Sequence, residues 1–452
     1  MFTQSDSSAA ERLRLCDGLL RGDGPLGQLR ARLPWCASGP DEPAPHRPRH
    51  RRLRDPAGPA PRPLRAERRA AAPPAPLTAQ STTQPEVTVT NTQHGKRGGP
   101  PAAATERQTM RAVVQDRYGA APEDVLRIAQ TGRPTPGAGE VLVRVHASSV
   151  DRGTWHVMAG LPYPIRLAGF GLRRPKYANP GRNLAGTVDA VGDGGTGFTP
   201  GDAVFGIGTS TFAEYAVAPT ATIAAMPATL TFDQAAAVPV SGLTALQAVR
   251  DHGRVRAGQA VLVVGASGGV GTFAVQLAKA FDAEVTGVCS TGKVDLVRSL
   301  GADHVIDHTR ADFADGRRRY DVILDIGGNA RLARLRRALT PRGRLVIVGG
   351  ETDGRLLGGV DRQLRAMVLS PFTGQHLGTF VASENSADLM TLRELLEADR
   401  LTAVVDEVYP LDQAAAAIRH VLDGRARGKV VITVPERRVQ GSPLEHHDGN
   451  QR

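Results

Sequence analysis

A glycine-rich turn between a strand and a helix is the feature that most constrains the fold of this chain. Residues 261–271 read VLVVGASGGVG. The first five residues are short, apolar and rich in valine, which is typical of a buried strand. Residues 272–281, TFAVQLAKAF, then follow the helical period. A strand, a glycine turn and a helix in this order form the arrangement that a dinucleotide-binding turn requires.

The turn matches the phosphate-binding pattern G-x-G-x-x-G, with Ala266, Gly268 and Gly271 at its three glycine positions. Gly268 would let the backbone approach a pyrophosphate, and Gly271 would let the helix pack tightly on the strand. The helix N-terminus adds free N–H groups and a partial positive charge. The alternative is a glycine-rich helix start that binds nothing. The predicted cofactor-binding residues of the turn are Ala266, Ser267, Gly268, Gly269, Val270 and Gly271.

The end of the second predicted strand, 284–289, indicates which cofactor is bound. An acidic residue at this place normally binds the ribose 2′-hydroxyl of NAD. Here Ser290 stands there, followed by Thr291 and Lys293. No carboxylate would repel a 2′-phosphate, while two hydroxyls and a cation are present to bind it. We therefore predict NADPH rather than NADH; the alternative is that Lys293 only solvates the start of a helix.

Length and composition bound the class of protein. The 452 residues, 41% of them hydrophobic, are enough for two or three domains with globular cores. No apolar run approaches the roughly 20 residues of a membrane span, and no secretory signal pattern begins the sequence. Three cysteines, Cys16, Cys36 and Cys289, are too few for a disulfide framework or a four-cysteine zinc site. We expect a cytoplasmic protein without a membrane partner.

Most of the net charge of +11 lies in residues 1–109, which hold 17 Lys and Arg against 10 Asp and Glu. The sequence of residues 1–109 is rich in Pro, Arg and Ala and shows neither a helical nor a strand period, which indicates a disordered basic extension. A transit segment is one alternative. Another is that translation starts at Met110, where foldable patterning begins. Because aromatic residues do not alternate with the arginines, we expect no nucleic-acid partner.

Along the rest of the chain the predicted secondary-structure pattern changes three times. Residues 110–234 form short strands between glycine and proline turns, as in a compact β domain. Residues 235–383 alternate strands with helices, which predicts a doubly wound parallel sheet. Residues 384–434 return to short elements that rejoin the β domain, and residues 435–452 are polar and frayed. The predicted strands of the parallel sheet are 261–265, 285–289, 304–308, 320–328, 343–350 and 375–383.

Residues 110–434 resemble the medium-chain dehydrogenase/reductase superfamily, in its zinc-free quinone oxidoreductase and enoyl-reductase-like branch. The motifs that carry the resemblance are GAAPEDVLRI (119–128), GEVLVRVHASSVD (139–151), PGRNLAGTVDAVG (180–192), FTPGDAVFG (198–206), AAAVPVSGLTAL (235–246), VVGASGGVG (263–271) and RGKVVITV (427–434). The resemblance implies an α/β protein in which a Rossmann domain is inserted into a GroES-like, β-rich catalytic domain. It also implies hydride transfer from NADPH to quinones, enones or enals.

The resemblance also bears on metal binding. Zinc-dependent relatives have a cysteine in the loop after GEVLVRV and a Gly-His-Glu before the AGTV strand. This chain has Asp151 in the first place, and Arg182 and Asn183 in the second. His146 and His156 remain, and two histidines without a third ligand are a poor zinc site. We therefore predict that no metal is bound.

The loop at 151–156 is the predicted substrate side of the site. The resemblance places Asp151 where related enzymes often have an asparagine near the nicotinamide. An ionised carboxylate cannot donate a hydrogen bond to a developing oxyanion, so Thr154 or His156 would have to do so. The candidate catalytic residues are Asp151, Thr154 and His156. The alternative for Asp151 is a turn cap.

Four further residues are predicted to contact the cofactor. Thr244 and Lys429 resemble family positions near it, and the alternatives are a buried helix threonine and a surface lysine. Gly327 and Gly349 end two strands at the carboxyl edge of the sheet, where such cofactors lie. Turn glycines without a ligand are the alternative for these two.

The sequence thus predicts a zinc-independent, NADPH-dependent reductase that acts on a small-molecule quinone or α,β-unsaturated carbonyl compound. One alternative is an NADP-dependent alcohol or aldehyde oxidoreductase. Another is a non-catalytic NADPH-binding redox sensor, because no acid or base residue stands out. Relatives often form dimers through the edge strand of the Rossmann sheet, so residues 375–383 are predicted to pair in a homodimer.

Overall fold

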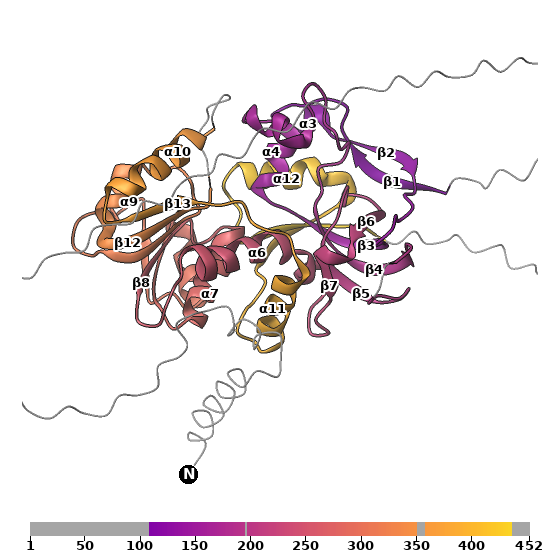
Figure 1. The fold of residues 1–452 in the computed structure, drawn as a ribbon. Helices are drawn as coiled ribbons and strands as arrows, with labels where there is room; N and C mark the ends of the chain where they lie inside the picture. Colours follow the sequence, from indigo (N-terminus) through magenta and orange to yellow (C-terminus); the bar gives the residue numbers. More distant parts are fainter. Residues whose placement is uncertain (1–107, 195–196, 350–357, 436–452) are drawn as a thin grey trace, which may run out of the picture. The chain divides into compact units, whose positions relative to one another are not determined.

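The computed structural model describes residues 108–194, 197–349 and 358–435 (Figure 1). The predictions for residues 1–107 and 436–452 lie outside this part of the chain. Within it the fold contains a two-stranded, a six-stranded and a seven-stranded sheet. The two larger sheets correspond to the Rossmann and GroES-like parts that the sequence predicts, so the predicted α/β class is confirmed.

The seven-stranded sheet belongs to the catalytic domain and is built from both ends of the described chain. Its strand order is β14-β15-β3-β4-β5-β7, and β6 also pairs with β3. The C-terminal strand β15 runs antiparallel to β3, with Val430 opposite Val150. The strands are β3 (Glu140–Val150), β4 (Asn183–Val191), β5 (Ala203–Ile207), β6 (Tyr215–Pro219), β7 (Ile223–Ala225), β14 (Val405–Pro410) and β15 (Lys429–Thr433). A separate ribbon pairs β1 (Thr109–Val114) with β2 (Arg127–Gly132).

The six-stranded sheet is parallel throughout, with the order β10-β9-β8-β11-β12-β13. Each strand overlaps one that the sequence predicts, and the order reverses between β8 and β11. Ligands of doubly wound sheets bind beyond the carboxyl ends of the strands at such a reversal. The strands are β8 (Ala260–Val264), β9 (Glu284–Cys289), β10 (His304–Asp307), β11 (Tyr320–Asp325), β12 (Leu339–Ile347) and β13 (His376–Thr379).

Helices cover both faces of this sheet, which is why its central strands are apolar on both sides. Val261 and Val263 of β8 pack in one cluster with Phe273 and Leu243. Leu262, between them, packs in another cluster on the opposite face. The helices that contact its strands are α7 (Gly269–Ala280), α8 (Val294–Ser299), α9 (Leu332–Ala338) and α10 (Val360–Leu369). Next to them, α6 (Pro239–Gln247) contacts α7, and α11 (Ser386–Glu397) contacts α6, whereas α5 (Phe232–Ala236) and α12 (Ala414–Leu422) contact the seven-stranded sheet.

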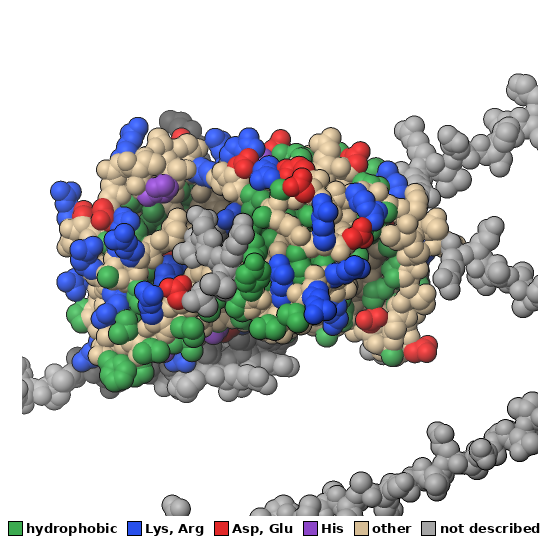
Figure 2. All heavy atoms as spheres, turned by 90° about the horizontal axis from the view of Figure 1, so that it is seen from above, with side chains coloured by type: hydrophobic (Ala, Val, Ile, Leu, Met, Phe, Trp, Pro, Cys, Tyr) green, Lys and Arg blue, Asp and Glu red, His purple; other side chains and the backbone are tan. Residues whose placement is uncertain are grey.

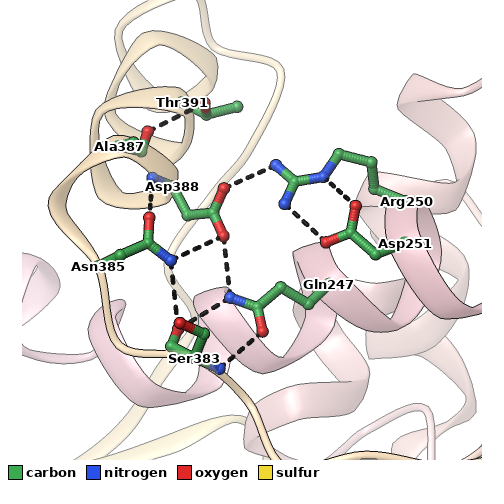
Figure 3. A network of polar contacts seen from close by, with 8 residues as sticks. All are labelled: Gln247, Arg250, Asp251, Ser383, Asn385, Ala387, Asp388 and Thr391. Atoms are coloured by element: carbon green, nitrogen blue, oxygen red, sulfur yellow. Dashed lines mark hydrogen bonds and ion pairs between the residues drawn. The ribbon is translucent and has the colours of Figure 1, made fainter. Parts of the chain in front are cut away.

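A polar network joins the end of α6 to the start of α11, where the chain leaves the Rossmann sheet (Figure 3). Arg250, in the helical turn after α6, donates to Asp388 at 2.7 Å, and Gln247 donates to the same carboxylate at 2.8 Å. Burial alone would raise the pKa of Asp388, but these bonds and the Arg250 charge hold it below its ordinary value. The network therefore fixes the return of the chain toward the catalytic domain.

The structure corrects one local prediction. Residues 151–156 do not form a loop but enter a helix, α4 (Arg152–Ala159). Asp151 caps it, because its side chain accepts from the Thr154 N–H at 3.0 Å and its own N–H donates to the Thr154 hydroxyl. This capping box starts the helix despite Gly153 in the first turn. Gly160 ends it in the left-handed conformation, with φ of 61°.

Candidate functional site

The predicted phosphate-binding turn has the backbone geometry that its glycines require. Gly265 has φ of 85°, which favours glycine. A Cβ on Gly271 would lie 2.1 Å from the Gly265 carbonyl oxygen, so only glycine lets α7 pack this closely on β8. A Cβ on Gly268 would meet only that same oxygen, at 3.6 Å. Packing therefore does not require a glycine at this position, and the open space beside Gly268 is compatible with the close approach of a ligand.

The strand β15 completes the turn from the far end of the chain. Gly268 and Gly428 form a parallel bridge, and the Gly428 N–H donates to the Ser267 carbonyl at 2.9 Å. A Cβ on Gly269 would lie 2.9 Å from Lys429 Cδ and 3.2 Å from Ser241 Oγ. The predicted residues Ser267, Gly269 and Lys429 therefore meet at the N-terminus of α7.

Two polar atoms at this point have no partner among the described residues. Lys429 is 1% exposed, and its Nζ makes no hydrogen bond there; the same holds for the buried Ser241 Oγ. Burial lowers the pKa of Lys429, and the Asp151 charge only partly offsets this. A buried amine beside a positive helix end is costly without an anion. A pyrophosphate would supply that anion, so these residues fit a dinucleotide.

The predicted glycines after β11 and β12 lie beside the same turn. A Cβ on Gly265 would be 2.8 Å from the Gly327 N–H nitrogen, and one on Gly349 would be 2.3 Å from the Ile326 carbonyl oxygen. Arg362 of α10 donates to the Gly349 carbonyl at 2.9 Å and is paired with the buried Asp325. The carboxyl ends of β8, β11 and β12 are thus brought together, with little room for side chains between them.

The residues after β9 lie at a second part of the site. Lys293 donates to the carbonyls of Gly424 and Ala426, at 2.8 and 2.7 Å, and has one hydrogen left for a ligand. Burial lowers the pKa of Lys293. Thr291 donates its hydroxyl to Asp307 at 2.6 Å, so it can only accept from a ligand in this arrangement. Ser290, directly after β9, is half-buried.

Arg427 is a residue of this part that sequence reasoning missed. Its guanidinium Nη2 lies 3.9 Å from where a Cβ on Gly292 would be, and the residue is exposed. No side-chain hydrogen bond or ion pair ties it to the described residues. Its place next to the last strand, far from Gly292 in sequence, explains why no local pattern pointed to it.

The three predicted catalytic residues differ in what they are free to do. Asp151 is held by Thr154 and by the Asn183 amide, which donates at 3.0 Å. Thr154 is buried, 1% exposed, and its hydroxyl serves the capping box. His156 lies with Nδ1 2.8 Å from the Leu161 carbonyl, which assigns the ring proton to Nδ1. Burial lowers the pKa of His156, so it is neutral near pH 7 with Nε2 as an acceptor.

Asn183 connects this group to Thr244. The Asn183 Oδ1 accepts from the Val240 N–H at 2.9 Å, and the Thr244 hydroxyl donates to the Val240 carbonyl at 2.6 Å. Thr244 therefore offers lone pairs, which suit an amide donor such as a carboxamide. In the sequence Asn183 indicates only a missing zinc ligand, whereas in the structure it links Asp151 to α6.

Among the described residues no three His, Cys, Asp or Glu side chains are grouped as a metal site. Asp151 and Asn183, which stand where zinc-dependent relatives have ligands, hydrogen-bond to each other instead. None of the helices in this part of the chain is both long and apolar enough to cross a membrane.

Two protein-family models match the sequence. "Alcohol dehydrogenase GroES-like domain" matches residues 137–228, and "Zinc-binding dehydrogenase" matches residues 300–432. Among curated proteins, the quinone oxidoreductase of Sus scrofa is 31% identical over 73% of this chain and 99% of its own length. The chloroplastic quinone oxidoreductase QR1 of Triphysaria versicolor is 30% identical over 72% of this chain and 98% of its own.

Solved structures show the same fold. The quinone oxidoreductase from Coxiella burnetii matches with a TM-score of 0.62 and 27% identity, over 73% of this chain and 100% of its own. The CurK enoyl reductase matches with a TM-score of 0.62 and 25% identity, over 72% of this chain and 99% of its own. A mycobacterial protein whose structure was solved in complex with NADPH matches with a TM-score of 0.60 and 26% identity, over 72% of this chain and 99% of its own. This chain is an oxidoreductase that uses a nicotinamide cofactor and belongs to the medium-chain dehydrogenase/reductase superfamily, in its quinone oxidoreductase-like branch.

Proposed function

We propose that this protein is an NADPH-dependent reductase that transfers hydride, without a metal ion, to a quinone or an α,β-unsaturated carbonyl compound. The observation that carries the proposal is the buried Lys429 amine at the N-terminus of α7, which like the Ser241 hydroxyl has no hydrogen-bond partner among the described residues. Lys429 and the free N–H groups of the turn would hold the pyrophosphate, and the nicotinamide supplies the hydride when the cofactor is bound.

The preference for NADPH rests on the residues after β9. Ser290, the third hydrogen of Lys293 and the exposed guanidinium of Arg427 would bind the adenosine 2′-phosphate. Arg427 presents a fork of donors that suits a phosphate. Two carboxylates lie at this part of the site. Asp307 accepts from the hydroxyls of Thr291 and Thr309, and Asp406 accepts from the Arg427 N–H at 3.0 Å. If NADH were the cofactor, Asp307 would be the residue to bind its ribose.

The proposal that no metal takes part rests on the chemistry of the donors. The place of the first zinc ligand holds Asp151, whose two oxygens accept from Thr154 and Asn183. The nearby imidazole of His156 has its Nδ1 bound to the Leu161 carbonyl. A capped carboxylate, Asp151, replaces the thiolate, and the Arg182 guanidinium replaces the imidazole that zinc prefers.

The substrate class follows from the lack of a ready proton donor among the described residues of this group. Asp151 is a carboxylate, the Thr154 hydroxyl is buried in the capping box, and His156 is neutral with an acceptor facing away from Leu161. An acceptor that spreads its new negative charge over a ring or an enolate needs such a donor less than a simple ketone or aldehyde does. This favours quinones and enones, and lets water protonate the product. In this scheme Asp151 orients α4 through its cap.

The test is turnover by the full chain with NADPH or NADH against quinones, enals and enones, before and after incubation with a zinc chelator. NADPH oxidation that depends on a quinone or enone and survives the chelator is expected. Alcohol oxidation with NADP⁺ as the only activity, or loss of activity with the chelator, would contradict the proposal. Tight NADPH binding without turnover on the whole panel would favour the redox-sensor alternative.

A further inference from the structure

The segment after α4 carries an excess of positive charge in the sequence. Between residues 160 and 182 there are five Lys and Arg and no Asp or Glu, and of these Arg182 forms an ion pair with Glu384. Balanced charge is normal elsewhere in the folded part, where ion pairs such as Arg111 with Glu214 are frequent. The imbalance is therefore local, and it coincides with the stretch that joins α4 to β4.

Three of these cations lie together in an exposed loop, residues 171–177. Arg173, Arg174 and Lys176 are all exposed, and none forms an ion pair with the residues that the structure describes. The Lys176 ammonium stands over the Tyr177 ring, 5.3 Å from its centre. Cations that are solvated and unpaired at a single loop suit an anionic surface.

Large apolar side chains are exposed in the same segment. Leu167 is 77% exposed and Leu172 is 63% exposed, while Tyr163 and Tyr177 are 41% and 36% exposed. Leucines with tyrosines and basic residues around them are the composition of protein segments that lie in the interface of a bilayer. A nucleic acid would not use the leucines, and both tyrosines already have cations over their rings.

The segment is held firmly, so its exposure is a built feature. The Tyr118 hydroxyl lies 2.7 Å from the Phe170 carbonyl and 2.6 Å from the Gly171 carbonyl. The Lys176 N–H donates to the Phe170 carbonyl at 2.7 Å, which closes the loop on itself. Arg166 stacks on the Tyr118 ring at 4.4 Å. These contacts fix the backbone and leave the leucines and the three cations outside.

The segment also lies next to the candidate site. His156 of α4 contacts the Leu161 carbonyl, and a Cβ on Gly358 would meet Pro162 at 2.8 Å, so the segment reaches the residues that follow β12. Figure 2 looks onto the side of the molecule where α3 (Pro122–Val125) and α4 lie in Figure 1. On it, basic side chains lie beside hydrophobic ones.

We propose that residues 163–177 dock this protein on the surface of a membrane that contains anionic phospholipids. Leu167 and Leu172 enter the boundary between headgroups and acyl chains, and Arg173, Arg174 and Lys176 bind the lipid phosphates. Surface docking needs no spanning helix, so it is compatible with the helices of this chain. It places α4 and the residues that follow it beside the lipid phase, where an apolar acceptor is dissolved.

The test is co-sedimentation of the full chain with vesicles of phosphatidylcholine, with and without phosphatidylglycerol. Binding to the mixed vesicles that weakens with salt is expected. Arg173→Glu with Arg174→Glu should lower the partition coefficient at least about tenfold. Leu167→Ser with Leu172→Ser should lower it by a similar factor and leave the salt dependence in place. Quinone turnover in solution should be unchanged in both variants.

Matched controls separate the loop from general charge, including that of residues 1–109. Arg317→Glu with Arg319→Glu reverses two exposed cations of the β10–β11 connection, and Val381→Ser removes another exposed apolar side chain. Neither control variant should change the partition coefficient on the mixed vesicles by more than about twofold. Equal binding to both vesicle types, or loop variants that behave like these controls, would overturn the proposal. A raised KM for a phosphate-bearing substrate with unchanged vesicle binding would assign the loop to substrate recognition and overturn it as well.

Discussion

Lys429 and Asp151 carry opposite charges at neighbouring ends of two paired strands. Val430 lies opposite Val150 in the antiparallel register of β15 with β3, and the two charged residues come directly before the one and after the other. Asp151 has hydrogen-bond partners on both oxygens, while the Lys429 amine has none among the described residues. Among the described residues the Lys429 hydrogens are therefore unused at the N-terminus of α7, where a phosphate would accept from them.

Lys429→Met should separate cofactor binding from stability. It removes a buried, unpaired charge and keeps the volume, so the free energy of unfolding without cofactor should rise by about 1–3 kcal/mol. The affinity for NADPH and for NADH should fall about 10- to 100-fold, because a charge-assisted contact to phosphate is lost. Titration calorimetry measures the affinity for each cofactor, and thermal unfolding measures the stability. Lys279→Met, at a surface ion pair with Asp303, is the control and should leave binding unchanged.

The stability effect of Lys429→Met should also depend on pH. Burial lowers the pKa of Lys429 in the folded state, whereas in the unfolded chain it keeps its ordinary value of 10.5. Between these values the unfolded state binds more protons, so the stability of the unmodified protein rises with pH. The advantage of the variant should be largest at the lower pH and shrink toward pH 10.5. An advantage that grows with pH would contradict the burial of a charged amine.

Two glycines of the turn should respond to substitution in opposite ways. Gly268→Val should keep the melting temperature within a few degrees, because a Cβ there meets only one atom, at 3.6 Å, but should abolish cofactor binding. Gly271→Val should unfold the domain at lower temperature, because its Cβ would lie 2.1 Å from the Gly265 oxygen. Normal NADPH binding by a folded Gly268→Val protein would show that the turn does not bind the pyrophosphate.

The preference for NADPH should depend on Lys293 and Arg427. Lys293→Ala and Arg427→Ala should each weaken NADPH more than NADH, by about 1–3 kcal/mol, the range for a lost charge-assisted contact. Asp307→Asn should shift the preference further toward NADPH, because a negative charge is removed. The ratio of kcat/KM for the two cofactors is the measurement. Equal losses with both cofactors would refute a role in binding the 2′-phosphate.

The network around Asp388 should contribute to acid stability. Asp388→Asn should lower the free energy of unfolding by about 1–3 kcal/mol near pH 7, because Arg250 loses a half-buried partner. The folded pKa of Asp388 is below its ordinary value of 3.8, so this contribution is present above that pH and is lost as the pH falls through the folded pKa. Asp295→Asn, in an exposed pair with Arg298, should change stability by less than about 0.5 kcal/mol.

The homodimer stays a prediction, and the structure supplies residues with which to test it. β13 is an edge strand, and α10 beside it exposes Leu364, Met367 and Val368 at helical spacing. Phe372, which follows α10, is 82% exposed. Val368→Glu with Phe372→Glu should convert a dimer to a monomer in light scattering, while Met390→Glu on α11 should not. A monomeric unmodified protein would contradict the prediction.

The sequence predicted the sheets better than it predicted the site. Strands such as 261–265 carry their own apolar pattern, and the glycine turn after it has a local signature. α4 was missed although Asp151 and Thr154 form a recognisable cap, because Gly153 hides the helical pattern. α10 was missed for two reasons. Its sequence follows a glycine-rich stretch, and its apolar residues lie on an exposed face instead of packing on the core.

The partners of the site residues depend on contacts between distant parts of the chain. Lys293 donates to the carbonyls of residues 424 and 426, and Thr291 to Asp307 on the neighbouring strand. No local period encodes these pairs. The sequence could thus identify Lys293 and Thr291 as candidates, but it could not show that their hydrogens are largely in use.

The bridge between Gly268 and Gly428 has a consequence for biosynthesis. The strands and helices of the nucleotide-binding sheet leave the ribosome before Lys429 is made, so a nascent chain can assemble that sheet while its phosphate site still lacks the amine. Only when the last strand joins β3 does the site close. If Lys429 holds the pyrophosphate as proposed, a chain truncated before residue 428 would keep the strands and helices of the nucleotide-binding sheet and bind its cofactor weakly.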